Sequence, residues 1–156
     1  MSEFSHVDSR GAARMVDVSG KPVSVRTSRA TGRVEVSPEV IALLNGDGVP
    51  KGDAIAVARI AGIQAAKRTP DLVPLCHPIA IHGVVVDVAV QDNHVAITAE
   101  VRTADRTGVE MEALTCVAVA GLALIDMVKA VDPAATISEV RVEEKTGGAS
   151  GTWRRG

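Results

Sequence analysis

Two runs of alternating apolar residues, joined by a short polar turn, are the feature that most constrains the fold. Valine occupies every second position of residues 84–90, and Val95, Ile97, Ala99 and Val101 repeat the pattern after the turn. Side chains of a strand point alternately to its two faces, so each run places one apolar face toward a core. The segment Gln91-Asp92-Asn93 suits the connecting turn. We therefore predict a β-hairpin over residues 84–101.

Helical and strand patterns on both sides of this hairpin complete one fold pattern. Ser37-Pro38 is typical of a helix start, with Asn45-Gly46 as its end. Further patterns predict a short strand at 33–36, helices at 53–68 and 107–131, and a strand at 137–145. The order is βαββαβ, which favours an α+β, ferredoxin-like sandwich with an antiparallel sheet and its helices on one face.

A length of 156 residues suits a single domain over 1–156. Residues 1–30 are polar and aperiodic, and they predict an extended, mobile N-terminal arm. Residues 146–156 are rich in glycine and predict a flexible tail.

Charge and composition exclude several function classes. The 17 basic and 19 acidic residues leave no basic excess, and aromatic residues make up only 1%, so nucleic-acid binding is not expected. The apolar run 113–125 is shorter than the ~20 residues of a membrane span, so we expect no membrane association. Two cysteines form no disulfide framework, and the chain shows no secretory leader. We expect a cytoplasmic protein.

The proline-rich loop 74–78 holds the first candidate for chemistry. His77 precedes Pro78 and follows Cys76, and a histidine on such a rigid loop suits acid–base work or phosphate binding. Cys76 suits a nucleophile or a metal ligand. The alternative is a surface histidine beside a buried cysteine. No other cysteine or histidine has metal-ligand spacing, so no metal centre is expected.

The start of the helix at 107–131 carries the second candidate. Thr107 and Glu110 have the spacing of a capping box, which offers a purely structural role for Glu110. Glu112 lies about 200° around the helix from Glu110 and precedes an apolar run, so capping does not explain it.

Near the end of the same helix, Asp126 and Lys129 have the spacing of a surface ion pair. The stretch 113–125 before them is apolar on all sides, which predicts that a subunit interface covers it. Lys51 precedes the helix at 53–68, and Lys67 lies at its end. Lys145 begins a glycine-rich stretch whose backbone N–H groups suit phosphate binding, with a disordered tail as the alternative.

Seven blocks of this sequence, taken in order, resemble the MoaC family of molybdenum cofactor biosynthesis. They are Met15–Ser19, Lys51–Asp53, Ala58–Lys67, Leu75–Pro78, Thr107–Thr115, Asp126–Lys129 and Lys145–Gly148. The resemblance covers about residues 12 to 151. One departure is Ala149, where the family usually carries a second lysine.

The resemblance implies a lyase that converts (8S)-3',8-cyclo-7,8-dihydroguanosine 5'-triphosphate to cyclic pyranopterin monophosphate and pyrophosphate. It also implies a substrate supplied by a radical SAM GTP cyclase and a homohexamer, a trimer of dimers, with active sites at the dimer interface. We expect no cofactor, and assistance by Mg²⁺ stays open.

Carried over by motif, the implied catalytic residues are Asp126, Lys129, Lys51 and Glu112. The implied substrate-binding residues are Leu75, Cys76, His77, Met111, Glu112, Glu110, Lys67 and Lys145. Two other readings stay open: a phosphate-binding module without turnover, and a structural oligomer whose charges cap helices and pair across interfaces.

Helix geometry adds one expectation about assembly. Glu112 and Asp126 are 14 residues apart, which is about 21 Å along a continuous helix. One chain is then unable to bring both carboxylates to the same reacting atoms. If both are catalytic, Glu112 of one subunit joins Asp126 of another.

Overall fold

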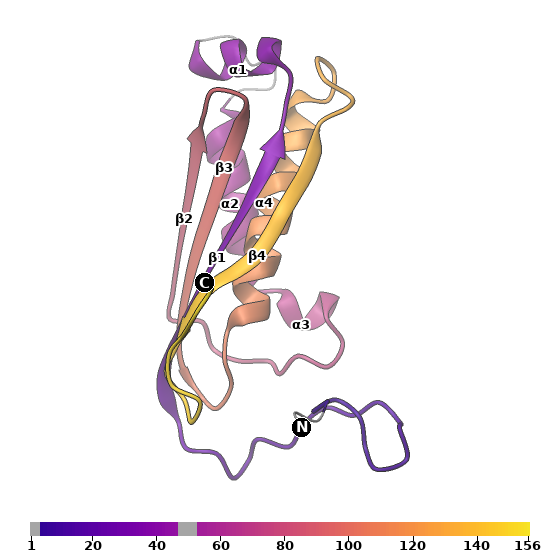
Figure 1. Cartoon of the computed structure of the whole chain (residues 1–156), viewed down its shortest axis with the longest axis vertical. Helices are drawn as coiled ribbons and strands as arrows, with labels where there is room; N and C mark the ends of the chain where they lie inside the picture. The colour runs from indigo at the N-terminus through magenta and orange to yellow at the C-terminus, as the bar shows by residue number, and fades with distance from the viewer. Residues whose placement is uncertain (1–3, 47–52) are drawn as a thin grey trace.

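Five strands form one antiparallel sheet in the computed structural model, which describes residues 4–46 and 53–156 (Figure 1). The elements in chain order are β1 (Ser24–Glu35), α1 (Pro38–Asn45), α2 (Ala54–Ala66), α3 (Thr69–Leu72), β2 (Gly83–Val90), β3 (His94–Asp105), α4 (Glu110–Val128), β4 (Thr136–Thr146) and β5 (Trp153–Arg154). The strand order across the sheet is β2-β3-β1-β4-β5. The predicted α+β class is confirmed.

The hairpin that the alternating valines predict is the β2–β3 pair. Its register places Val86 opposite Ala99 and Val88 opposite Ile97, so the apolar positions of both strands share one face. All four of these side chains are buried. The hairpin is confirmed, with β3 extending four residues beyond Val101, the end of its apolar run.

The first strand is much longer than the predicted 33–36 and takes up part of the predicted arm. β1 begins at Ser24 and pairs with β3 on one side and β4 on the other, which makes it a central strand. Its inward positions from Ser28 onward are small: Ser28, Ala30 and Gly32 precede Val34. Hydropathy alternation does not reveal a strand whose buried side chains are small or polar. The extended N-terminal arm therefore ends at residue 23, not 30.

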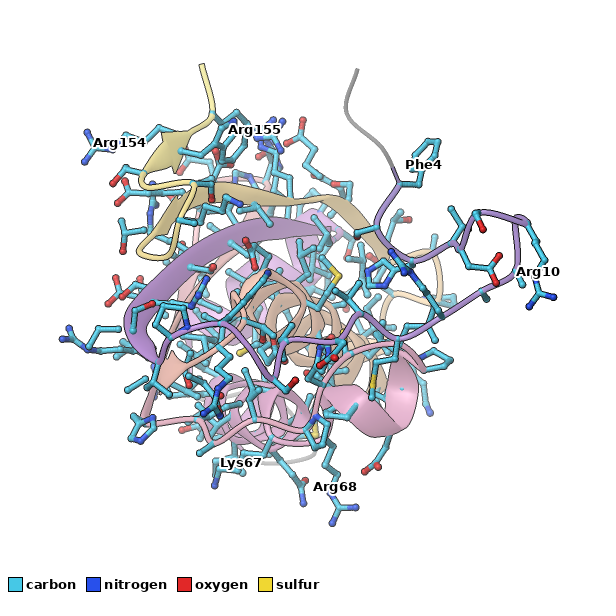
Figure 2. The ribbon with its side chains drawn as sticks, turned by 90° about the horizontal axis from the view of Figure 1, so that it is seen from below. Phe4, Arg10, Lys67, Arg68, Arg154 and Arg155 are labelled. Atoms are coloured by element: carbon cyan, nitrogen blue, oxygen red, sulfur yellow. The ribbon has the colours of Figure 1, made fainter. Side chains whose placement is uncertain are left out.

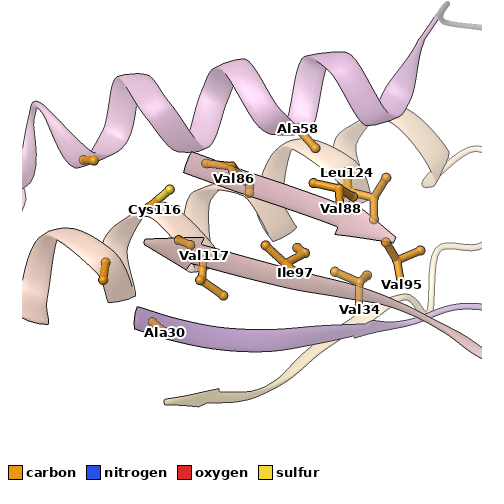
Figure 3. Close-up of a cluster of buried hydrophobic side chains, with 14 of the residues drawn as sticks. Ala30, Val34, Ala58, Val86, Val88, Val95, Ile97, Cys116, Val117 and Leu124 are labelled. Carbon is orange, nitrogen blue, oxygen red and sulfur yellow. The ribbon is translucent and has the colours of Figure 1, made fainter. Parts of the chain in front are cut away.

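Helices α2 and α4 run antiparallel and cover the same face of the sheet (Figure 1). Gly62 makes their close approach possible, because a Cβ atom there would lie 3.0 Å from the Cys116 carbonyl oxygen. The core between helices and sheet consists mostly of valine and alanine with Ile97 and Leu124 (Figure 3). The expectation of helices on one face is thereby met for the described residues.

By length and composition alone, α4 is long and apolar enough to cross a membrane, at 19 residues and a mean hydropathy of 1.9. It instead packs against α2 and three strands, and half of its most apolar stretch is buried inside the molecule. This burial accounts for the inward-facing half of the apolar stretch, as in a core helix, and leaves Leu122 exposed on the outer face. α4 ends at Val128, three residues before the predicted end.

The glycine-rich tail returns to the sheet. Trp153 and Arg154 form β5 against β4, and Arg155 stacks over the Trp153 ring at 5.6 Å. Gly147 and Gly148 have φ angles of 88° and 78°, which L side chains rarely adopt. A Cβ atom at Gly147 would also collide with the Val25 carbonyl oxygen of β1. The tail thus passes close to the first residues of β1.

Gly32 allows the closest approach between α4 and the sheet, and this yields a stability prediction. A Cβ atom at Gly32 would lie 2.5 Å from Val117 Cγ1. We expect Gly32→Ala to lower the free energy of unfolding by about 1–3 kcal/mol through overpacking. Combining it with Val117→Ala should cost less than the sum of the two single changes.

Urea unfolding of the two single variants and the double variant measures this coupling. Gly20→Ala is the matched control, since no atom lies within 4 Å of a Cβ atom there. Strictly additive losses for Gly32 and Val117 would show that their close contact does not limit the packing.

Candidate functional site

The candidate site lies at the end of the molecule where α4 begins, next to the loop that carries Cys76 and His77. A cavity of about 230 Å³ opens there between that loop, the first turn of α4 and the N-terminal arm. Its lining residues are Ser5, His6, Val16, Val18, Lys21, Leu75, Cys76, His77, Thr107, Gly108, Glu110, Met111 and Glu112. The arm therefore forms one wall of the cavity.

A second cavity of about 660 Å³ adjoins the first and leads toward the glycine-rich tail. It shares Ser5, His6, Lys21, Gly108, Glu110 and Met111 with the first cavity. Its own lining residues are Arg26, Ser28, Val142, Lys145, Thr146, Gly147, Ser150 and Trp153. Because six residues line both, we treat the two cavities as one groove, with Glu112 at one end and Arg26 and Lys145 at the other.

Glu112 is the buried acid of the groove, with only 3% of its surface exposed. Burial raises the pKa of Glu112, and the nearby Glu110 carboxylate raises it further, while a hydrogen bond from its own backbone N–H opposes them. A carboxyl group whose pKa is shifted toward neutral pH is suited to take up and return a proton.

The expected capping box does not form, and Glu110 has a different partner. α4 starts after Val109, no side chain caps it, and the Thr107 hydroxyl donates instead to the Gly108 carbonyl oxygen. Glu110 pairs with Lys145 of β4, at 3.3 Å between Oε1 and Nζ. This ion pair ties the start of α4 to the strand that leads into the tail.

Neither cysteine has the environment of a thiolate nucleophile. Burial raises the pKa of the Cys76 thiol, and the Glu112 carboxylate raises it further. Burial raises the pKa of Cys116 to about 12, and this side chain is enclosed between α2 and α4. The arrangement favours a packing or orienting role for Cys76 over covalent chemistry.

His77 connects the loop to the N-terminal arm. Its Nε2 donates a hydrogen bond to the Val16 carbonyl oxygen at 2.5 Å, so the proton is on Nε2. Val16 and Val18 line the cavity beside His77. This bond holds the arm against the groove.

Arg26 is the second cation at the tail end. Its Nε donates to the Asp105 carbonyl oxygen at 3.2 Å, and its terminal nitrogens lie against Gly148. Any side chain at Gly148 would occupy the place of the Arg26 guanidinium. Arg26 and Lys145 thus face the second cavity from neighbouring strands, β1 and β4.

The structure brings together most of the residues that the sequence singled out. Seven of them line the groove: Leu75, Cys76, His77, Glu110, Met111, Glu112 and Lys145. Lys67 is exposed at the C-terminal end of α2 and lines neither cavity. Figure 2 shows it beside Arg68, across the molecule from Arg154 and Arg155. Lys51 lies outside the described residues.

Asp126 and Lys129 are at the opposite end of α4 from Glu112. They form an ion pair of 2.5 Å, with 60% and 57% of their side-chain surface exposed, respectively. Since α4 is continuous from Glu110 to Val128, the two carboxylates of Glu112 and Asp126 stay apart within one chain. The expected separation along the helix is confirmed.

Sequence reasoning missed the contribution of the arm. His6 and Lys21 line both cavities, yet neither belongs to a periodic pattern or a recognisable motif. Only tertiary contacts over more than sixty residues bring the arm to the groove. Among residues 4–46 and 53–156, no three His, Cys, Asp or Glu side chains converge as they would around a metal ion.

Known proteins with similar sequences share one description. A chain from Streptomyces avermitilis is 68% identical over 97% of this chain and 89% of its own length. One from Mycobacterium bovis is 58% identical, covering 98% and 92%, and one from Thermomicrobium roseum is 55% identical, covering 99% and 95%. The first and third are named cyclic pyranopterin monophosphate synthase, and the second cyclic pyranopterin monophosphate synthase 2.

The MoaC family pattern matches residues 15–148, which include every lining residue of the groove except Ser5, His6, Ser150 and Trp153. The match and the relatives together cover the arm, the loop of His77, α4 and β4. The chain belongs to the MoaC family.

Proposed function

We propose that this chain is a lyase of molybdenum cofactor biosynthesis, a cyclic pyranopterin monophosphate synthase. It converts (8S)-3',8-cyclo-7,8-dihydroguanosine 5'-triphosphate to cyclic pyranopterin monophosphate with release of pyrophosphate. The observation that carries the proposal is one continuous groove with a buried acid, Glu112, at one end and the cations Arg26 and Lys145 at the other. Relatives at 55–68% identity bear the name of this activity.

The two ends of the groove supply the two kinds of chemistry that the reaction needs. A triphosphate-derived substrate carries several negative charges, which Lys21, Arg26 and Lys145 neutralise. The same cations stabilise the charge that develops on the leaving pyrophosphate. Rearrangement of a purine-derived ring needs proton transfers, for which Glu112 has the raised pKa and the protected position.

A second subunit completes the site in this proposal. Asp126 lies about 21 Å from Glu112 along α4, farther than a nucleotide-sized pocket spans, and Lys129 lies beyond it. The outward faces of α2 and α4 expose Ile60 and Leu122 at 64% and 57%, which favours contact with another copy of the chain. We propose a homohexamer, a trimer of dimers, in which Asp126 and Lys129 of one subunit approach Glu112 of another, while Lys67 lies at the end of its own chain where α4 begins (Figure 1).

The proposal extends to the setting of the reaction. A radical SAM GTP cyclase supplies the substrate, and the protein works in the cytoplasm. The groove itself supplies acids, bases and cations, so the proposed reaction proceeds without an organic cofactor, and Lys51 contributes a further catalytic amine.

One incubation tests the activity. The purified chain is mixed with the cyclic dihydro-GTP product of the radical enzyme, and pyranopterin and pyrophosphate are measured. Formation of both supports the synthase. Binding without turnover would identify a phosphate-binding module, and neither binding nor turnover would leave a structural oligomer.

Asp126→Asn and Lys129→Ala should each lower turnover by about a hundredfold or more, because a removed acid–base group costs about 10²–10⁴ in rate. Their ion pair is exposed, so stability should change by less than about 1 kcal/mol. Steady-state kinetics and thermal unfolding measure the two effects. Arg141→Ala, which removes another exposed ion pair, is the control and should leave turnover intact.

Subunit mixing tests the shared site. Inactive Glu112→Gln and Asp126→Asn proteins are combined under conditions that allow subunit exchange. Half of randomly paired dimers are mixed, and each mixed dimer regains one of its two sites, so activity should approach about a quarter of wild type. Proven exchange without recovered activity would mean that the two carboxylates do not share a site across the interface.

Glu112→Gln should also change the pH dependence of stability. Because burial raises its pKa, ionised Glu112 destabilises the folded state at neutral pH, and wild type gains stability as pH falls toward the usual glutamate pKa. At pH 7 the Gln variant should be more stable than wild type, by about 0.5–2 kcal/mol as for typical single stabilising changes. Urea unfolding should show this difference shrink by pH 4.5, and a constant difference would contradict the burial of a charge.

A further inference from the structure

The N-terminal arm, residues 4–23, is held to the domain by its backbone carbonyl groups at two points. His77 Nε2 donates to the Val16 carbonyl oxygen, and Arg106 Nε donates to the Lys21 carbonyl oxygen at 3.0 Å. The second contact joins residues 85 apart in the sequence. Figure 1 shows the arm at the end of the molecule where α4 and β1 begin.

Lys21 occupies a special place in the groove. It lines the two cavities that form the groove and a third of about 490 Å³, which Pro22, Ser24, Arg26, Gly148, Ala149 and Ser150 also line. Among the residues that the structure describes, no other is common to the linings of all three. Lys21 therefore lies where the end of the groove next to Glu112, the end next to Lys145 and the glycine-rich tail meet.

The backbone around Lys21 fixes where that side chain starts. The Lys21 N–H donates to the Val18 carbonyl oxygen at 3.0 Å, and Pro22, which follows Lys21, disfavours the helical region for the Lys21 backbone. The Arg106 bond to the Lys21 carbonyl then attaches this turn to the domain.

Arg106 is well placed to hold the turn that contains Lys21. It lies between the end of β3 and the segment Thr107–Gly108 that lines the first cavity, and its N–H donates to Asp105 Oδ1 at 2.7 Å. Arg106 lines none of the three cavities, so it acts on the groove through another residue.

We infer that Arg106 is a positioning residue: by holding the Lys21 carbonyl, it keeps the Lys21 ammonium group at the junction of the groove, where that group binds phosphate. The inference rests on the proposed function only in identifying the phosphate as part of a nucleotide-derived substrate. A pyrophosphate group has the charge and the size for this junction.

Binding of inorganic pyrophosphate, measured by calorimetry, tests the inference without any turnover. Arg106→Gln and Lys21→Ala should each weaken binding about tenfold, and the double variant should bind no more weakly than Lys21→Ala alone. Arg102→Gln, which removes another exposed arginine of β3, is the matched control and should bind as wild type does. Additive losses, or no binding by wild type, would overturn the inference.

Hydrogen exchange measured by mass spectrometry gives a second readout. Arg106→Gln should speed exchange in peptides covering residues 16–26 by about tenfold and leave the β2–β3 hairpin unchanged. Unchanged exchange in the arm would show that Arg106 does not hold it.

Kinetics separates this inference from the proposed function. With an active enzyme, Arg106→Gln should raise KM about tenfold and keep kcat within about threefold. A fall in kcat with KM unchanged would overturn the positioning role. If wild type binds pyrophosphate but forms no pyranopterin, the proposed function is wrong, and the positioning role of Arg106 is unaffected.

Discussion

Close packing of α4 against its neighbours is the constraint on which the rest of the structure depends. Glycine lies at its contact with each of three elements: Gly32 of β1 beneath Val117, Gly62 of α2 beside Cys116, and Gly121 of α4 itself against Ile137 of β4. A side chain at any of them would meet atoms at 2.5–3.2 Å. These contacts place the first turn of α4, and with it Glu112, against the loop of Cys76 and His77. The site is thus a consequence of how close the helix lies to the sheet.

The same packing buries Glu112, which disfavours its charged form and suits the side chain to proton transfer. A carboxylate at 3% exposure beside Glu110 and Cys76 has no ion pair among the described residues, so its charged form is disfavoured. Lys145 pairs with Glu110 instead, which leaves Glu112 as the group with the raised pKa. Two carboxylates two residues apart therefore acquire different roles from their surroundings, one structural and electrostatic, the other suited to proton transfer.

Elements with a clear hydrophobic pattern could be predicted from the sequence, whereas β1 and the long-range contacts of the site could not. Alternating valines predicted β2 and β3 because large apolar side chains mark the buried face directly. β1 was underestimated, because Ser28, Ala30 and Gly32 fill its buried face with side chains that hydropathy does not single out. Spacing suggested a capping box at Thr107 and Glu110, but the same spacing serves an ion pair to Lys145, and only the fold decides between them. Lys21 and Arg106 meet across 85 residues, a contact that no local pattern encodes.

The geometry of α4 also explains why the proposed site, which uses both ends of this helix, needs a second subunit. A straight helix of 19 residues holds the groove at one end and the pair Asp126–Lys129 at the other, and no bend in it brings them closer. Folding them onto one site within a chain would require breaking the helix that forms the core. Antiparallel packing of two copies instead brings unlike ends together without altering either chain, and it covers Leu122 and Ile60 in the same step. If both ends of α4 serve one reaction, the continuous core helix itself requires that the site be shared between subunits.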